Sequence, residues 1–387
     1  MDFEFSEEER IFQENLREYL QKTLRPKIKL IDNTGIPRDF ISDSSKYGIW
    51  AMPVSEEVGG QGASFVMTAI ASEEIGRADF TMATAVFFLL ESGWGYILDK
   101  YGNEELRKEV LPNVTSGKWF LGISSTEATG GSDIANIRTL ATKRDKKYLI
   151  NGQKMYVSGV MEAKEMGGGH LTLVKTNPQA KHRGISMLYV PTNSPGLNVS
   201  KLENMGRMGI STGIMTYDNV EVPERYLVGE ENNGFYYSMD GFNHARVLVG
   251  AACLGSSEAI LDMGLDYIKQ REAFGSKLKD FQSIAFEASE LKTKLEMARL
   301  LVYKTAWMLD HEEKYKDDIP TFAAMSKLVA PQVAFDIVKS VMMWMGAYGY
   351  SKDAMIEMAY RGIMSYLVGA EGALNVMKLI ISKRILM

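Results

Sequence analysis

The spacing of hydrophobic residues divides the chain into three segments. In the first, apolar residues recur every four positions from Phe12 to Leu24, the interval of an amphipathic helix, and Ser6 with Glu9 precedes them as a capping box. After Lys118 short strands alternate with polar turns, and from Gly234 the helical period returns. The pattern predicts an α+β protein with a helical domain at residues 1–117, a β-barrel or β-sandwich domain at 118–230, and a helical bundle at 231–387.

The stretch from Thr81 to Leu98 is almost entirely apolar and predicts a buried core helix. Its one charge is Glu91, and a buried carboxylate costs free energy unless it is paired or used in chemistry. We expect Glu91 to lie at a surface-facing end of the helix, and a functional role is the alternative.

Composition excludes several classes of protein. The 387-residue chain carries a net charge of −5 and no basic cluster, which argues against a nucleic-acid partner. No apolar run approaches the ~20 residues of a membrane span. The single cysteine, Cys253, excludes an internal disulfide and fits a reducing cytoplasm. The four histidines lack metal-ligand spacing, so we expect no metal site.

One loop and three later motifs carry the candidate chemistry. Leu121–Asp133 reads LGISSTEATGGSD, and its hydroxyls and glycines suit close contact with phosphate and flavin oxygens. It resembles the T-E-P-x-x-G-S-D signature of the flavin-dependent acyl-CoA dehydrogenases. Lys154–Gly159 (KMYVSG), Gln270–Gln282 (QREAFGSKLKDFQ) and Met345–Tyr350 (MGAYGY) resemble that family's other motifs in the same order. The resemblance covers nearly the whole chain and is nearest to the branch containing the non-decarboxylating glutaryl-CoA dehydrogenases of anaerobes.

This resemblance implies a fold and an activity. The fold is an N-terminal helical domain, a middle β domain and a C-terminal four-helix bundle, with FAD between the last two. The activity is α,β-dehydrogenation of an acyl-CoA in fatty-acid metabolism, in which a glutamate removes the α-proton and hydride passes to flavin N5. An electron-transfer flavoprotein as electron acceptor, a homotetramer and a cytoplasmic location are also implied. An acyl-CoA oxidase, an enoyl-CoA reductase of the same fold and a non-catalytic nucleotide-binding relative remain alternatives.

The resemblance also assigns residues to the two ligands. The cofactor contacts that it implies within one subunit are Ile123, Ser125, Thr126, Ser132, Tyr156, Ser158, Ala373 and Asn375. The contacts to a neighbouring subunit's FAD are Arg271, Phe274, Gln282, Met343, Gly346 and Ala347. The substrate side comprises Ser132, Asn243, Arg246, Gly372 and Glu91. Met343 and Ala347 stand where the family has Gln and Gly, and methionine cannot donate the hydrogen bond that glutamine would.

By the same resemblance the catalytic base is Glu371. The interval from Arg361 to Glu371 is one residue longer than the family's common pattern, and an ungapped alignment would put Ala370 at the base position. One inserted residue restores the match. The family's alternative base position is Ala245 here, so Glu91 is the only second candidate.

The acyl pocket is expected along the helix near Met82–Leu90. This segment contains no cation. We therefore expect a plain aliphatic, aromatic or alicyclic acyl group rather than glutaryl.

Overall fold

The N-terminal part of the computed structural model, which describes residues 4–386, is helical. Its helices are α1 (Glu7–Thr23), α2 (Ile28–Thr34), α3 (Arg38–Ser45), α4 (Phe65–Ala78), α5 (Ala83–Leu89), α6 (Gly95–Tyr101) and α7 (Glu104–Thr115). The predicted capping box starts α1: Ser6 accepts a hydrogen bond from the Glu9 backbone, and the Glu9 carboxylate accepts one from the Ser6 N–H. A π-helical turn, η3 (Leu90–Trp94), joins α5 to α6.

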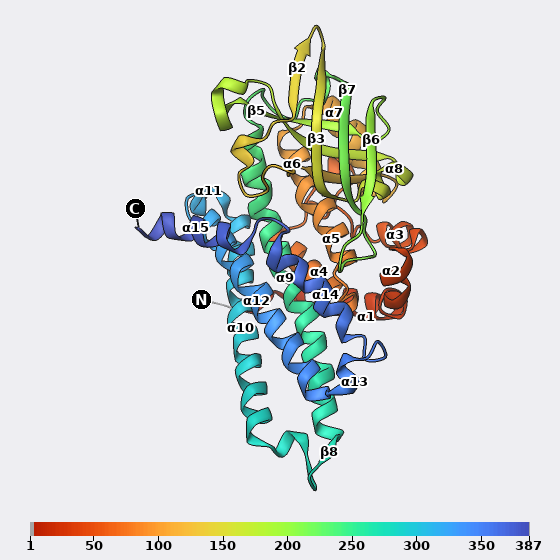
Figure 1. Cartoon of the computed structure of the whole chain (residues 1–387), viewed down its shortest axis with the longest axis vertical. Helices are drawn as coiled ribbons and strands as arrows, with labels where there is room; N and C mark the ends of the chain where they lie inside the picture. The colour runs from red at the N-terminus through yellow and green to blue at the C-terminus, as the bar shows by residue number, and fades with distance from the viewer. Residues whose placement is uncertain (1–3, 387) are drawn as a thin grey trace.

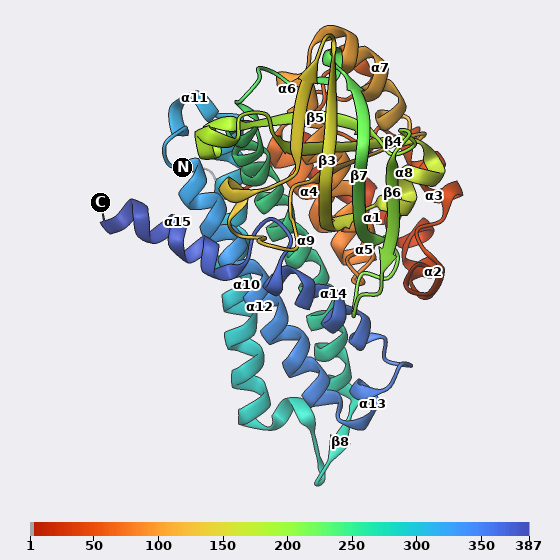
Figure 2. The ribbon, with the colours of Figure 1, turned by 45° about the horizontal axis from the view of Figure 1, so that its top comes forward.

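The middle part is a single curled sheet of seven strands (Figures 1 and 2). The strands are β1 (Phe120–Ser124), β2 (Leu140–Arg144), β3 (Lys147–Ser158), β4 (Gly168–Lys175), β5 (Ile185–Pro191), β6 (Leu197–Leu202) and β7 (Thr212–Pro223), with the short helix α8 (Val160–Met166) after β3. Their order is β1-β4-β2-β3-β7-β6, and β5 pairs with β4. β1 and β2 run parallel to β4, whereas the other pairs are antiparallel.

The C-terminal part is a bundle of long helices that extends away from the sheet (Figure 1). Its helices are α9 (Gly234–Gln270), α10 (Gln282–Asp310), α11 (Glu312–Tyr315), α12 (Ile319–Met345), α13 (Ala347–Tyr350), α14 (Ile356–Val368) and α15 (Leu374–Leu386). A small hairpin of β8 (Glu272–Ala273) and β9 (Ser276–Lys277) lies at the end far from the sheet.

Close backbone contact joins α9 to the N-terminal helices. A Cβ atom on Gly76 of α4 would lie 2.2 Å from the carbonyl oxygen of Ala252, and one on Gly255 would lie 1.8 Å from that of Glu73. Only glycine allows the two helices to cross this closely. The upper half of α9 is thereby fixed between the N-terminal helices and the rest of the bundle.

Two helices, α9 and α12, have the length and composition of a membrane span. In α9, 78% of the most apolar window is buried against other parts of the protein. A core helix of a globular fold meets the same criteria, so these two helices are weak grounds for a membrane location.

Candidate active site

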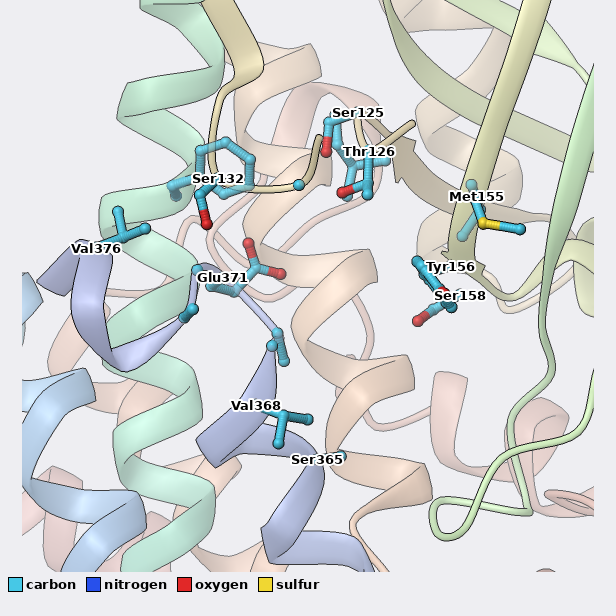
Figure 3. Close-up of a pocket in the computed structure, with 18 of the residues that line it drawn as sticks. Ser125, Thr126, Ser132, Met155, Tyr156, Ser158, Ser365, Val368, Glu371 and Val376 are labelled. Atoms are coloured by element: carbon cyan, nitrogen blue, oxygen red, sulfur yellow. The ribbon is translucent and has the colours of Figure 1, made fainter. Parts of the chain in front are cut away.

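A cavity of about 1030 Å³ opens where the three parts meet. Ligand pockets usually measure ~300–1,000 Å³, so this one is large enough for more than a small molecule. Its walls include the η3 end of α5, the end of β3, α9 and the loop before β7. The others are the turn between α14 and α15 and the loop after β1, which contains most of the Leu121–Asp133 motif and is called the signature loop below. Figure 3 shows Glu371 on that turn, its carboxylate pointing towards the loop that carries Ser125 and Ser132.

A buried ion pair fastens the signature loop to β3. The Lys154 ammonium lies 3.0 Å from Glu127 Oε1 and donates to the Ser125 carbonyl at 3.1 Å. The other Glu127 oxygen accepts the Arg138 N–H at 2.7 Å. Burial lowers the pKa of Lys154 to about 8 in spite of its carboxylate partner. Glu127 and Lys154 therefore shape the loop, and the neighbouring hydroxyls are left to face the cavity.

A β-bulge turns the end of β3 towards the cavity. The β3–β7 register shifts between Lys154 and Val157, and Tyr156 adopts a left-handed conformation (φ 59°) with 63% of its surface exposed. Ser158 lies opposite Thr212 of β7. The Thr212 hydroxyl lines the cavity and, among the residues described, has no hydrogen-bond partner although it is buried. An aromatic face and two hydroxyls are thus presented from this wall.

The turn carrying Glu371 has an unusual backbone. Ala370 (φ 41°), Glu371 (φ 62°) and Gly372 (φ 109°) are all in the left-handed region, which costs free energy for the two residues that bear a Cβ. Two buried cations hold the turn: Arg246 Nε donates to the Glu371 carbonyl at 3.1 Å, and Lys327 Nζ donates to the Gly372 carbonyl. The backbone of this turn therefore fixes the direction of the Glu371 side chain.

Glu371 has the properties of a base poised near neutral pH. Its Oε2 atom is buried and finds no hydrogen-bond partner in the described part of the chain. Burial raises the pKa of this carboxyl to about 7, against the opposing charges of Arg246, Lys327 and Arg207. A carboxylate with such a pKa can accept a proton from a weak carbon acid and still be partly ionised at neutral pH.

Glu91 lies elsewhere. It is completely buried in η3 and does not line the cavity, so the expectation that it sits at a surface-facing end of the helix is wrong. One oxygen accepts the Leu121 N–H at 3.2 Å, and burial raises its pKa well above the ordinary value. Glu91 therefore fixes the start of β1 through its bond to Leu121, and it does not contact the cavity.

Comparison with known proteins agrees with this geometry. Three family models match in order: acyl-CoA dehydrogenase N-terminal domain over residues 6–118, middle domain over 122–220 and C-terminal domain over 232–386. An acyl-CoA dehydrogenase of Bacillus subtilis is 32% identical over 98% of both chains, and a glutaryl-CoA dehydrogenase of Desulfococcus multivorans is 30% identical over 99% of this chain and 97% of its own. The crystal structure of an acyl-CoA dehydrogenase from Geobacillus kaustophilus superposes with a TM-score of 0.91 at 30% identity, covering 100% of each chain.

The chain belongs to the acyl-CoA dehydrogenase family. The family and the fold class predicted from the motifs are confirmed, and with them membership of an oxidoreductase family.

The structure brings most of the predicted site residues to one place. The predicted residues that line the cavity are Ile123, Ser125, Thr126, Ser132, Tyr156, Ser158, Arg246, Glu371, Gly372 and Ala373. Asn243 stands behind this wall and accepts a hydrogen bond from Arg246 at 3.1 Å. Asn375 is not part of the lining.

The other predicted cofactor residues lie at the far end of the bundle. Arg271 and Phe274 are on or beside the β8–β9 hairpin, Gln282 starts α10, and Met343 lies in the last turn of α12, near Gly346 and Ala347. Phe274 is 97% exposed and Met343 75% exposed. They do not reach the cavity of their own chain, so their role towards a neighbouring subunit stays a prediction.

Sequence reasoning missed three residues of the site. Lys327 stands among apolar residues in the first half of α12, a pattern that could have indicated a buried ammonium. Thr212 and Arg207 gave no comparable signal, because only the folded loop before β7 brings them to the cavity.

Proposed function

We propose that this protein is an FAD-dependent dehydrogenase that removes the α-proton of an acyl-CoA thioester with Glu371. The observation that carries the proposal is the unpaired Oε2 of Glu371, on a buried carboxyl with a pKa of about 7, facing a large cavity lined by hydroxyl groups. General bases work best when their pKa lies near the operating pH.

The hydrogen-bonding groups that line the cavity suit FAD. Ser125, Thr126 and Ser158 offer hydroxyls, Thr212 offers one without a partner in residues 4–386, and Tyr156 offers an aromatic face to a planar ring. When bound, FAD supplies the acceptor for the hydride that leaves the β-carbon. The signature loop, held by the Glu127–Lys154 pair, would keep these hydroxyls in place.

The turn that carries Glu371 also offers a hydrogen-bond donor to the thioester oxygen. As the α-proton leaves, negative charge grows on the thioester oxygen, and backbone N–H groups stabilise such charge well. The backbone N–H of Glu371 donates no hydrogen bond to another described residue and is available for this purpose. Arg246 and Lys327 hold the carbonyls of the turn, so the N–H and the carboxylate keep their relative positions.

We further propose a homo-oligomer in the cytoplasm, with a tetramer as the expected form. Phe286, Met297, Leu300 and Trp307 are exposed on α10, and their spacing places them on one face of that helix. With the exposed Phe274 they form an apolar surface that a second copy of the chain would cover. Light scattering that finds a monomer with full flavin occupancy would refute this part.

An electron-transfer flavoprotein is the proposed electron acceptor. A relative 28% identical over 99% of this chain is the caffeyl-CoA reductase-Etf complex subunit CarC of Acetobacterium woodii, which supports an acceptor of this kind. The same relative supports a second candidate, an enoyl-CoA reductase that runs the same chemistry in reverse.

Anaerobic bleaching of the flavin tests the function. The purified protein should be yellow, and its absorbance should fall when acyl-CoAs are added without oxygen. A protein without flavin, or one that no acyl-CoA in a broad panel bleaches, would contradict the proposal. Reoxidation by electron-transfer flavoprotein but not by oxygen separates the dehydrogenase from an oxidase, and turnover from enoyl-CoA with reduced acceptor identifies the reductase.

A further inference from the structure

Three arginines line the cavity, and they differ in their partners. Arg246 donates to the Glu371 carbonyl and to Asn243, and Arg361 is paired with Asp32 and Glu357. The side chain of Arg207 makes no hydrogen bond or ion pair with any residue of the described chain, and its Nε is buried. Arg207 is half-buried, and a polar atom buried without a hydrogen-bond partner costs free energy, so a ligand group that pairs with this side chain would be favoured.

The loop that carries Arg207 cannot easily withdraw. A Cβ on Gly206 would lie 2.2 Å from the Arg361 carbonyl oxygen, and one on Gly209 would lie 2.5 Å from the Ile31 side chain. Arg361 also donates to the Met205 carbonyl at 3.2 Å. Between these two fixed points Arg207 adopts a left-handed backbone conformation (φ 58°), which is rare for a residue with a Cβ. The backbone of Arg207 is therefore held in the cavity wall by the fold.

Tyr366 adds a second donor. Its side chain lines the same cavity and its hydroxyl, although buried, has no partner within residues 4–386. Burial raises the pKa of Tyr366 far above its usual range, so the hydroxyl remains a neutral donor. Arg207 and Tyr366 line the same cavity, and the charge of Arg207 acts on the Tyr366 hydroxyl.

Arg207 and Glu371 line the same cavity, and the positive charge of Arg207 lowers the pKa of Glu371 against the effect of burial. Neither side chain has a hydrogen bond, so the two groups do not pair directly. An anionic group of the substrate that binds Arg207 would consequently belong to its acyl group, which is the part next to the reacting carbons. This position differs from the wall formed by Met82–Leu90, on which the expectation of an apolar acyl group rested.

We propose that Arg207, with the Tyr366 hydroxyl, binds a terminal carboxylate of the acyl group, so that the preferred substrates are short ω-carboxyacyl-CoA thioesters. The proposal rests on the function proposed above and revises the expectation of a plain hydrocarbon acyl group. A guanidinium forms its strongest hydrogen bonds with a carboxylate.

The wild-type holoenzyme gives the first test. Single-turnover flavin reduction is compared between glutaryl-CoA, its terminal methyl ester and pentanoyl-CoA, with succinyl-CoA and adipyl-CoA to bracket chain length. We expect kcat/KM for the best diacid to exceed that for its ester by about 30-fold or more, the scale of a buried charge pair. Equal values for acid and ester would overturn the inference while leaving the dehydrogenase function standing. If no thioester reduces the flavin, the proposed function itself has failed.

The variant Arg207→Met is the second test, with Arg144→Met as the matched control. Arg144 is exposed at the end of β2 and does not line the cavity. Arg207→Met should reduce the acid-to-ester preference by about 30-fold or more, and Arg144→Met should leave it unchanged. Calorimetric binding of glutaryl-CoA to the Glu371→Gln holoenzyme, with and without Arg207→Met, should show the same loss without turnover. A variant that loses acid and ester activity in parallel, or that loses FAD, would show that Arg207 serves another group. If Arg207→Met does not fold, two other measurements test the proposal. Tyr366→Phe should lower the acid-to-ester preference by a smaller factor, and the wild-type comparison of acid and ester needs no variant.

Discussion

Replacing Glu371 by Gln tests the central assignment. The carboxamide keeps the size of the side chain and cannot take up a proton. At pH 7 about half of the wild-type molecules carry an ionised Glu371, since its pKa is about 7. General-base catalysis contributes ~10²–10⁴-fold in rate, so the first-order rate of flavin reduction should fall by roughly 10³-fold or more.

The same substitution should not destabilise the protein. The folded-state pKa of Glu371 is raised, to about 7 from ~4.3 in an unfolded chain, so the folded state binds the proton more tightly. The ionised form therefore costs folding free energy, which grows as pH rises from about 4 to about 7 and reaches up to ~4 kcal/mol above that range. Glutamine carries no such cost. At pH 8 the thermal midpoint of Glu371→Gln should equal or exceed that of the wild type.

The assay is anaerobic stopped-flow absorbance of the bound flavin, with acyl-CoA affinity measured separately by spectral titration. Glu91→Gln is the matched control. Since Glu91 lies outside the cavity and burial raises its pKa, Glu91→Gln should change the rate only a few-fold. If Glu371→Gln reduces its flavin at nearly the wild-type rate and Glu91→Gln does not, the assignment is wrong and Glu91 is the base.

Three further predictions concern the charges around the site. The rate of flavin reduction at low substrate concentration should rise with pH through about 7, because Glu371 must lose its proton to act; a flat pH profile would contradict this. Lys327→Met should move that inflection to higher pH, because a positive charge that favours the Glu371 carboxylate is lost. It should also lower the free energy of unfolding in urea by about 1–3 kcal/mol, because the Gly372 carbonyl loses its hydrogen-bond donor. An unchanged inflection would show that Lys327 does not affect the pKa of Glu371. Lys154→Met should cost about 3–5 kcal/mol, since it leaves Glu127 buried without its cation, and should weaken FAD retention on gel filtration; a stable variant with full flavin content would refute the role given to this pair.

Local patterns predicted the fold well because the physics that sets them is local. The capping box of α1 needs only Ser6 and Glu9, and the change from helical to strand periodicity after Lys118 matches the start of β1 at Phe120. The motif resemblance assigned Ser125 and Glu371 to one active site, and both line the same cavity although they lie far apart in sequence.

Burial and partners could not be predicted in this way. The interpretation of Glu91 as surface-facing failed because a π-helical turn, not visible in the residue pattern, directs its carboxyl to the backbone of β1. Arg207 looked like an ordinary loop arginine, and only the packing of Gly206 and Gly209 fixes it in the cavity. Both cases depend on contacts between segments that are distant along the chain.

The turn that carries Glu371 has a structural feature that the sequence alone does not reveal. In it Ala370 and Glu371 both take left-handed conformations, at a cost of about 1–3 kcal/mol each. The bonds from Arg246 and Lys327 to the carbonyls of this turn contribute about 1.5–3 kcal/mol each, as hydrogen bonds from charged groups do, and so offset that strain. The same two cations lower the pKa of Glu371 against the effect of burial. The position and the proton affinity of Glu371 therefore depend on one pair of buried cations, and a change in either cation should alter both.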